Sequence, residues 1–101
     1  MAGGDDQLGE ELVLETGRVR VWKDQVRPGE AQRLHTHRRP YLAVVVSGST
    51  VRTEDAEGNV LSAPAFRPGD VHYFDESVLP ITHTMRNTGT DDVEVVIIDL
   101  L

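Results

Sequence analysis

The chain has 101 residues, which is enough for one domain with a single hydrophobic core. Hydrophobic residues make up 39% of it, too many for a disordered chain, and its apolar runs are far shorter than the about 20 residues of a membrane helix. The net charge of −7 argues against a nucleic-acid partner, and the absence of cysteine excludes disulfides, thiolate catalysis and cysteine-ligated metals.

Residues 1–11 are rich in glycine and acidic side chains, and they lack the positive charge and apolar stretch of a signal peptide. We therefore expect a flexible acidic N-terminal segment over residues 1–11 and a folded domain over residues 12–101. We also expect a cytoplasmic protein that does not bind membranes. The only helical spacing in the chain, in residues 6–14, is weak because Gly9 interrupts it.

The first half of the chain predicts short strands between turns. Arg18 to Trp22 alternates polar and apolar residues, as a strand with one buried face does. After a turn at Arg27-Pro28-Gly29-Glu30, the run from Tyr41 to Val46 is apolar and β-branched, which predicts a strand buried on both faces. Ser47-Gly48-Ser49 ends that strand, and another is expected from Thr50 to Thr53.

The second half continues in the same way. Glu57-Gly58-Asn59 predicts a hairpin tip before a strand at Val60 and Leu61, and a sharp turn precedes the strand from Val71 to Phe74. Further strands are expected from Ile81 to Arg86 and from Val93 to Leu100. Many short strands with closely spaced turns predict an all-β sandwich or barrel.

Two of the four histidines, His35 and His37, are separated by a single residue. On a strand, residues i and i+2 point to the same face, so both imidazoles can reach one ion. Neutral imidazole binds Zn-like and Fe-like ions at about 2.1 Å. Since cysteine is absent, the ligands are restricted to histidine, carboxylate, tyrosine or backbone oxygen, which favours Fe(II), Mn, Ni, Cu or Zn.

The surroundings of this pair form a longer pattern. Gly29, five residues, His35-Thr36-His37, three residues, Tyr41, six residues and Gly48 follow one another. This pattern resembles the first motif of the cupin superfamily, G-x5-H-x-H-x3-E-x6-G, at every spacing.

A second pattern lies further along the chain. Arg67-Pro68-Gly69-Asp70 resembles the turn that opens the second cupin motif, and His83 to Asn87 resembles its closing H-x3-N. The resemblance is to a small single-domain cupin of the RmlC-like superfamily. It implies an all-β double-stranded β-helix, or jelly-roll barrel, and it implies three metal ligands: His35, His37 and His83.

The chain departs from the cupin pattern at two points. The position of the glutamate ligand is occupied by Tyr41. A tyrosine there can ligate as phenolate, hydrogen-bond a metal-bound water or pack in the barrel wall. Because the pKa of phenol is about 10, a neutral role is favoured.

The second departure is the stretch from Gly69 to His83, which is longer than in the simplest motif. We expect a loop with Asp75-Glu76-Ser77 at the barrel mouth. Within it, His72 is a wall residue, a base near the metal, or a ligand in place of the missing glutamate. Motif order favours His83 as the third ligand and leaves an exchange with His72 open.

A three-histidine site without glutamate resembles a subset of cupins that includes thiol dioxygenases and β-diketone-cleaving enzymes, which bind Fe(II) and activate O2. The resemblance implies one divalent transition metal, with Fe(II) favoured and Zn, Mn, Ni or Cu as alternatives. It favours a dioxygenase-like enzyme acting on a small anionic organic molecule. Two other hypotheses stay open: a non-redox metal cupin (an isomerase, a cyclase or a partner in N–N bond formation) and a non-catalytic module that binds or senses a small molecule.

Several residues are candidates for contact with a substrate. Arginines flank the histidine pair, and they form either a solvated surface or a positive mouth that attracts an anion. We expect Arg39 and Arg86 to bind the anionic group and Phe74 and Met85 to line the pocket.

The resemblance also implies a homodimer, since stand-alone cupins usually dimerise. A small barrel has exposed strand edges that a partner can cover. The run from Val95 to Ile98 is apolar on both faces, so we expect it between the sheets or at such an interface.

Overall fold

The computed structural model describes residues 7–101, which form nine strands and one short 3-10 helix. The remaining residues of the expected N-terminal segment, 1–6, lie outside the described part. Leu8 packs in the core and the first strand begins at Glu11, where the sequence offered only a weak helical spacing; the division at residue 12 stays a prediction. No helix within residues 7–101 is long and apolar enough to cross a membrane. The elements are β1 (Glu11–Glu15), β2 (Val19–Val26), β3 (His35–His37), β4 (Tyr41–Ser47), β5 (Val51–Glu54), β6 (Val60–Ser62), β7 (Val71–Phe74), η2 (Glu76–Val78), β8 (Ile81–Asn87) and β9 (Val93–Leu100).

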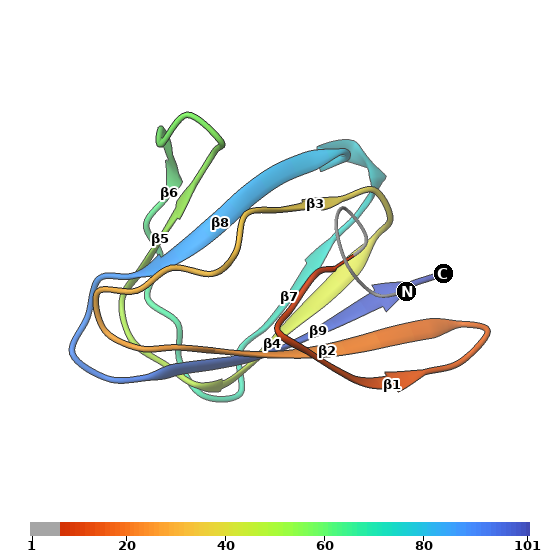
Figure 1. Ribbon diagram of the computed structural model, residues 1–101, viewed down its shortest axis with the longest axis horizontal. Coiled ribbons are helices and arrows are strands. Elements are labelled where there is room, and N and C mark those ends of the chain that lie inside the picture. The colour runs from red at the N-terminus through yellow and green to blue at the C-terminus, as the bar shows by residue number, and fades with distance from the viewer. Residues whose placement is uncertain (1–6) are drawn as a thin grey trace.

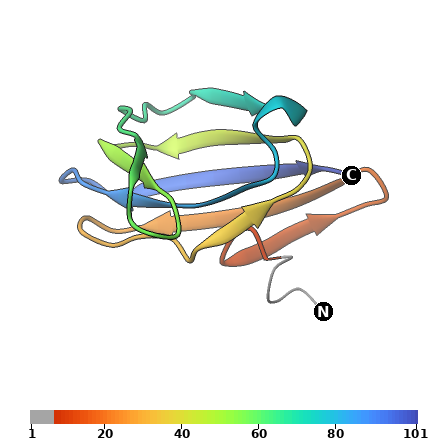
Figure 2. The same cartoon turned by 90° about the horizontal axis from the view of Figure 1, so that it is seen from above.

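The strands form two antiparallel sheets that face each other. One sheet has the order β1-β2-β9-β4-β7 and the other the order β3-β8-β5-β6. Figure 1 shows β3 and β8 across from β2, β9 and β4, and Figure 2 shows the strands of the five-stranded sheet side by side. The chain crosses repeatedly from one sheet to the other, as in a double-stranded β-helix. The expected all-β jelly-roll barrel is confirmed.

Alternation along the strands builds the core between the sheets. In β4 the odd-numbered residues from Tyr41 to Val45 are buried, the even-numbered ones are half-buried, and Val46 is exposed. The prediction of a strand buried on both faces was therefore wrong, because the second face of β4 is the outer surface of the barrel. In β9, Val95 and Ile97 likewise point inward.

The outer face of the five-stranded sheet carries a strip of apolar side chains. Val71 and Tyr73 are 61% and 59% exposed, and their neighbours across the sheet are half-buried. The second face of the run from Val95 to Ile98 belongs to this strip and does not lie between the sheets. The homodimer stays a prediction, and this strip is the surface we expect it to use. The strip consists of Leu42, Val44, Val71, Tyr73, Val96 and Ile98.

Two glycines of the first motif occupy backbone positions that would not accept a side chain. Gly29 has a φ of +83°, a conformation that residues with a side chain rarely adopt. At Gly48 the backbone passes so close to Phe66 that a Cβ atom would clash with the Phe66 carbonyl. These glycines allow the chain to turn at the ends of the strands that flank the histidines.

Asn87, the last residue of the second motif, ties the strand ends together. Its side chain is fully buried, and its Nδ2 donates to the carbonyl oxygens of Val26 (3.0 Å) and Asp91 (2.7 Å). Its Oδ1 accepts a hydrogen bond from the Gly89 N–H (2.9 Å), within the turn that follows β8. One amide thus links the end of β2, the end of β8 and the loop that leads to β9.

Asn87→Ala should lower the free energy of unfolding by about 3 kcal/mol, because it leaves the buried Val26 carbonyl and the part-buried Asp91 carbonyl and Gly89 N–H without this partner. Chemical denaturation of the metal-free protein measures this loss. Asn59→Ala is the matched control: Asn59 Nδ2 donates to Asp55 at an exposed hairpin tip, and its removal should cost less than about 1 kcal/mol. Equal losses for the two variants would contradict the role given to Asn87.

Candidate metal centre

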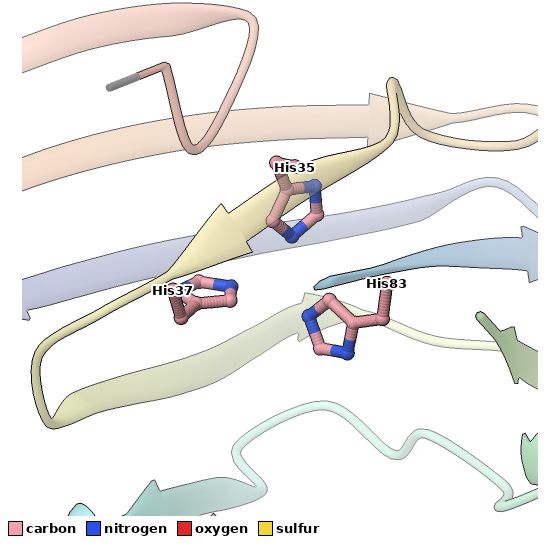
Figure 3. A group of neighbouring side chains, drawn as sticks. All are labelled: His35, His37 and His83. Atoms are coloured by element: carbon pink, nitrogen blue, oxygen red, sulfur yellow. The ribbon is translucent and has the colours of Figure 1, made fainter. Parts of the chain in front are cut away.

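The pairing of β3 with β8 brings three histidines to one place. His35 and His37 occupy alternate positions of β3 and share its inner face, and His83 of β8 lies directly opposite His35. In an antiparallel pair, opposite residues project to the same face, and diagonal neighbours are within reach of long side chains. Figure 3 shows the three rings turned toward one another from the two strands. The structure thus gathers the three residues that the sequence predicted as ligands.

The distances within the group suit a metal ion. The ring centroids lie 4.8, 4.9 and 5.1 Å apart, and one nitrogen from each ring lies within 4.8 Å of the other two. Three nitrogens spaced by that distance would lie about 2.8 Å from their common centre, against about 2.1 Å for a metal–imidazole bond. Small side-chain rotations remove the difference. Three nitrogens without sulfur also form the donor set of a divalent transition metal.

Each imidazole is neutral at neutral pH, as metal binding requires. Burial lowers the pKa of His37 to about 2 and that of His83 to about 4, and the neighbouring imidazoles contribute to both shifts. Burial also lowers the pKa of His35, although a hydrogen bond to the backbone opposes this. In that bond His35 Nδ1–H donates to the carbonyl oxygen of Arg33 (2.7 Å), which leaves the Nε2 lone pair of His35 for a metal.

His37 also has a buried nitrogen that the protein leaves unpaired. Its Nδ1 has no hydrogen-bond partner among the described residues, and its side chain is 1% exposed. A buried imidazole nitrogen of this kind is costly unless a ligand satisfies the ring. The group therefore fits a metal ion in its donor set, its spacing and its protonation.

Tyr41, which replaces the expected glutamate, stacks against one of these histidines. Its ring lies parallel to that of His37, with 3.6 Å between centroids and 10° between planes, and Phe74 stacks on it at 4.6 Å. Burial raises the pKa of the Tyr41 hydroxyl further above its ordinary value, so the phenol stays neutral. The raised pKa disfavours phenolate ligation. The Tyr41 hydroxyl is buried and has no hydrogen-bond partner among the described residues, so a hydrogen bond to a metal-bound water and simple packing beside His37 both stay predictions.

Two adjoining cavities lie inside the barrel. The first, of about 60 Å³, is lined by the three histidines and by mostly apolar residues that include Met85. The second, of about 330 Å³, extends from His83 toward β7. Phe74 lines both, so Phe74 and Met85 lie where the sequence placed them. The residues common to the two cavities are Ala43, Thr53, Phe66, Phe74 and His83.

His72 lines the larger cavity and lies outside the ligand group. It belongs to β7, in the sheet opposite β3 and β8, and its ring stacks on Phe66 at 5.3 Å. The group of atoms that could hold a metal contains His83 and not His72, in agreement with the order of the motif, and the choice of His83 as third ligand stays a prediction. A role for His72 as a base stays a prediction.

The two arginines expected to bind substrate do not line either cavity. Arg39 is more than half exposed and faces Asp99 at 3.8 Å. Arg86 pairs with Glu54 at 3.5 Å, and its Nη1 donates to the carbonyl of Gly29 at 3.4 Å. Arg86 follows the inward-facing Met85 on β8, so alternation directs it outward.

Gln32 and Asp24 belong to the site although the sequence pattern did not single them out. Gln32 lines the smaller cavity, and its Nε2 donates to Asp24 Oδ2 at 2.6 Å. Asp24 is 4% exposed and also accepts the backbone N–H of Glu10 at 2.9 Å. One signal was available: Asp24 lies between Trp22 and Val26 at the alternate spacing of an inward-facing residue. For Gln32, which precedes β3, no such signal exists.

Comparison with known proteins shows what this arrangement is similar to. By sequence, the chain matches no protein-family model and no curated protein. Solved structures do match. A cupin domain from Bordetella pertussis Tohama I has a TM-score of 0.76 and 20% identity, over 90% of each chain. An RmlC-like cupin with a double-stranded β-helix fold from Methanocaldococcus jannaschii has a TM-score of 0.68 and 16% identity, over 89% of this chain and 76% of the other.

A third match is an enzyme. The polyketide cyclase RemF from Streptomyces resistomycificus has a TM-score of 0.61 and 14% identity, over 84% of this chain and 56% of the cyclase. The present chain therefore corresponds to about half of that protein.

Two facing antiparallel sheets around three converging histidines define a small β-barrel protein with a site suited to a divalent metal. The solved structures identify the barrel: the chain has the double-stranded β-helix fold of the cupins. At identities of 20% and below, this likeness establishes the fold and leaves the reaction to be argued from the site.

Asp24→Asn should remove a pH dependence of stability. Burial raises the pKa of Asp24 to about 6, although hydrogen bonds from Glu10 and Gln32 oppose the shift. The native state therefore holds a proton that the unfolded chain releases near pH 4, and the contribution of Asp24 to stability falls as pH rises from about 4 to about 6. The variant should gain up to about 3 kcal/mol relative to wild type between pH 4 and pH 7.

Denaturation of the metal-free wild type and variant at both pH values measures this difference. The buried histidines, with their lowered pKa values, act in the opposite direction, but they are common to both proteins and cancel. A difference that does not change with pH would show that Asp24 titrates in its ordinary range.

Proposed function

We propose that the protein is a metal-dependent enzyme whose ion is held by His35, His37 and His83 and whose substrate is a small organic anion. Fe(II) and a dioxygenase-type reaction are the first candidates. The observation that carries the proposal is the group of buried, neutral imidazoles beside a mostly apolar cavity. When bound, Fe(II) supplies Lewis acidity, open coordination positions and the capacity to activate O2.

The charges around the site support an anionic substrate. Three neutral imidazoles leave the positive charge of a divalent ion uncompensated, and the residues that line the two cavities include no Asp or Glu. An anionic group of a substrate is then the natural counter-charge. Because the walls are apolar, that attraction acts in a medium of lower dielectric constant than water.

The residues around the histidines have supporting roles in this proposal. The carbonyl of Arg33 holds the His35 ring in one tautomer and one orientation. The stacked rings of Tyr41 and Phe74 restrain the plane of His37. The apolar lining keeps bulk water from the reacting atoms, which protects reactive species from hydrolysis.

A non-redox reaction is the second candidate, and one observation favours it. The polyketide cyclase RemF shares the fold at a TM-score of 0.61. The same histidines with Zn, Mn or Ni would supply Lewis acidity without O2 chemistry. The roles of the surrounding residues are the same for both candidates.

Elemental analysis of protein purified without a histidine tag tests the metal site. Wild type should contain close to one transition-metal ion per chain, and the His35→Ala/His37→Ala double variant should contain less than about a tenth of that, since it retains one ligand of three. His72→Ala is the matched control and should keep its metal. Equal metal content in wild type and double variant, with both folded by circular dichroism, would refute the proposal.

Oxygen consumption separates the two candidates. Fe(II)-loaded protein should consume O2 in the presence of members of a panel of small aromatic and aliphatic acids, and Zn-loaded protein should not. Turnover of such acids by the Zn form without O2 would favour the non-redox reaction.

A further inference from the structure

The larger cavity has the size of a small-molecule site. Its volume of about 330 Å³ lies near the lower end of the about 300–1,000 Å³ usual for ligand pockets. It joins the three-histidine cavity through His83 and Phe74, which line both. A molecule in the larger cavity can therefore place one end beside the histidines and extend toward β7.

The walls of this cavity are mostly apolar. Its polar members besides His83 are Thr53, Ser62 and His72. The hydroxyls of Thr53 and Ser62 bond to each other at 2.6 Å, so their strongest hydrogen bond is already made. The apolar wall consists of Ala43, Leu61, Pro64, Phe66, Phe74 and Ile81.

His72 differs from the other polar members because the protein gives it no hydrogen bond. Neither ring nitrogen has a hydrogen-bond partner among residues 7–101. Nε2 is covered by protein atoms, so Nδ1 is the nitrogen that a ligand in the cavity can reach. Its ring contact is the stack on Phe66. When a ligand displaces water from this nitrogen in a mostly apolar wall, the loss costs free energy unless the ligand itself forms a hydrogen bond with it.

The lining residues also limit the charge that a ligand can carry. No Lys or Arg lines either of the two cavities, and Arg39 and Arg86 are engaged with Asp99 and Glu54 outside them. A metal ion is then the one positive charge that a buried ligand can meet. A second anionic group at the far end of the molecule, such as that of a dicarboxylate, would lie against the apolar wall away from that ion, which is unfavourable.

We infer that the substrate is an organic acid with an apolar, ring-sized body and its charge at one end only; the acidic group meets the metal, and the far end hydrogen-bonds His72. Only the part of this inference that concerns the acidic group rests on the proposed function. The fit of the apolar body and the hydrogen bond to His72 depend only on the cavity. His72 is thus a specificity-determining residue that lies apart from the metal ligands.

A series of matched carboxylates tests the inference in Co(II)-loaded protein, with the visible spectrum of the ion as the readout. Phenylacetate should bind at least about tenfold more tightly than acetate, because it buries a ring. 3- and 4-hydroxyphenylacetate each add a hydroxyl to the ring. The isomer whose hydroxyl reaches His72 should bind about five- to tenfold more tightly than phenylacetate. 1,4-Phenylenediacetate, which carries a second carboxylate at its far end, should bind more weakly than phenylacetate.

Variants of β7 isolate the contribution of His72. His72→Phe keeps a ring on Phe66 and should abolish only the gain from the hydroxyl, whereas His72→Gln should retain part of it. Tyr73→Phe, which removes a polar group from the outer face of the same strand, should change nothing. The inference is overturned if acetate binds as tightly as phenylacetate, if 1,4-phenylenediacetate binds most tightly, or if His72→Phe weakens all ligands equally.

A second measurement separates this inference from the proposed function. If wild type binds no Co(II), the proposed metal site fails, and binding of phenol and toluene to the metal-free protein, followed by nuclear magnetic resonance, tests the cavity directly. Tighter binding of phenol than of toluene in wild type, with that preference lost in His72→Phe, supports the role of His72. The absence of the preference refutes it.

Discussion

The candidate site depends on the register between β3 and β8. Since His35 lies directly opposite His83 and two positions from His37, the antiparallel pairing itself places three imidazoles on one inner face. A shift of one residue in either strand would direct its histidines to the opposite face. β3 is only three residues long, so few ladder hydrogen bonds maintain this register. Bonds just outside the strand add to them: Gln32 N–H donates to the Met85 carbonyl at 2.9 Å, and Thr84 Oγ1 donates to the Gln32 carbonyl at 2.5 Å.

Much of this arrangement follows from the order of residues in the chain. The last strand, Val93 to Leu100, has the predicted bounds because an apolar run follows a turn rich in glycine and polar residues. The spacing of His35 and His37 was sufficient to place both on one face, because the geometry of a strand puts residues i and i+2 on the same side, whereas His83 was predicted from the resemblance to the second cupin motif. The alternation of inward and outward side chains along β8 also predicts the direction of Arg86, which the sequence predictions did not use. Counting in twos from His83 passes through Met85 and skips Arg86, so an outward Arg86 could be deduced.

Other features depend on packing between segments that are distant in the chain. The run from Tyr41 to Val46 has apolar residues at every position, and composition does not distinguish a face covered by the second sheet from a half-exposed outer face. The stack of Tyr41 on His37 requires β4 to follow β3 at a close angle, which no local pattern encodes. The contact between Gln32 and Asp24 joins a loop to a strand of the opposite sheet. Each of these three features can be predicted only once the tertiary arrangement is known.

The net charge of −7 and an anionic substrate are compatible because the relevant fields are local. Charges on the surface are screened over about 8 Å at physiological ionic strength, whereas an ion in an apolar cavity acts at close range and low dielectric. The buried acids near the barrel interior do not line the two cavities. Glu54 is compensated by Arg52 and Arg86, and the charge that Asp24 carries at neutral pH, above its raised pKa of about 6, is hydrogen-bonded by Gln32 and by the Glu10 N–H. A divalent ion on three neutral imidazoles would therefore dominate the potential inside the barrel, and the acidic exterior would chiefly slow the approach of anions without deciding what binds once inside.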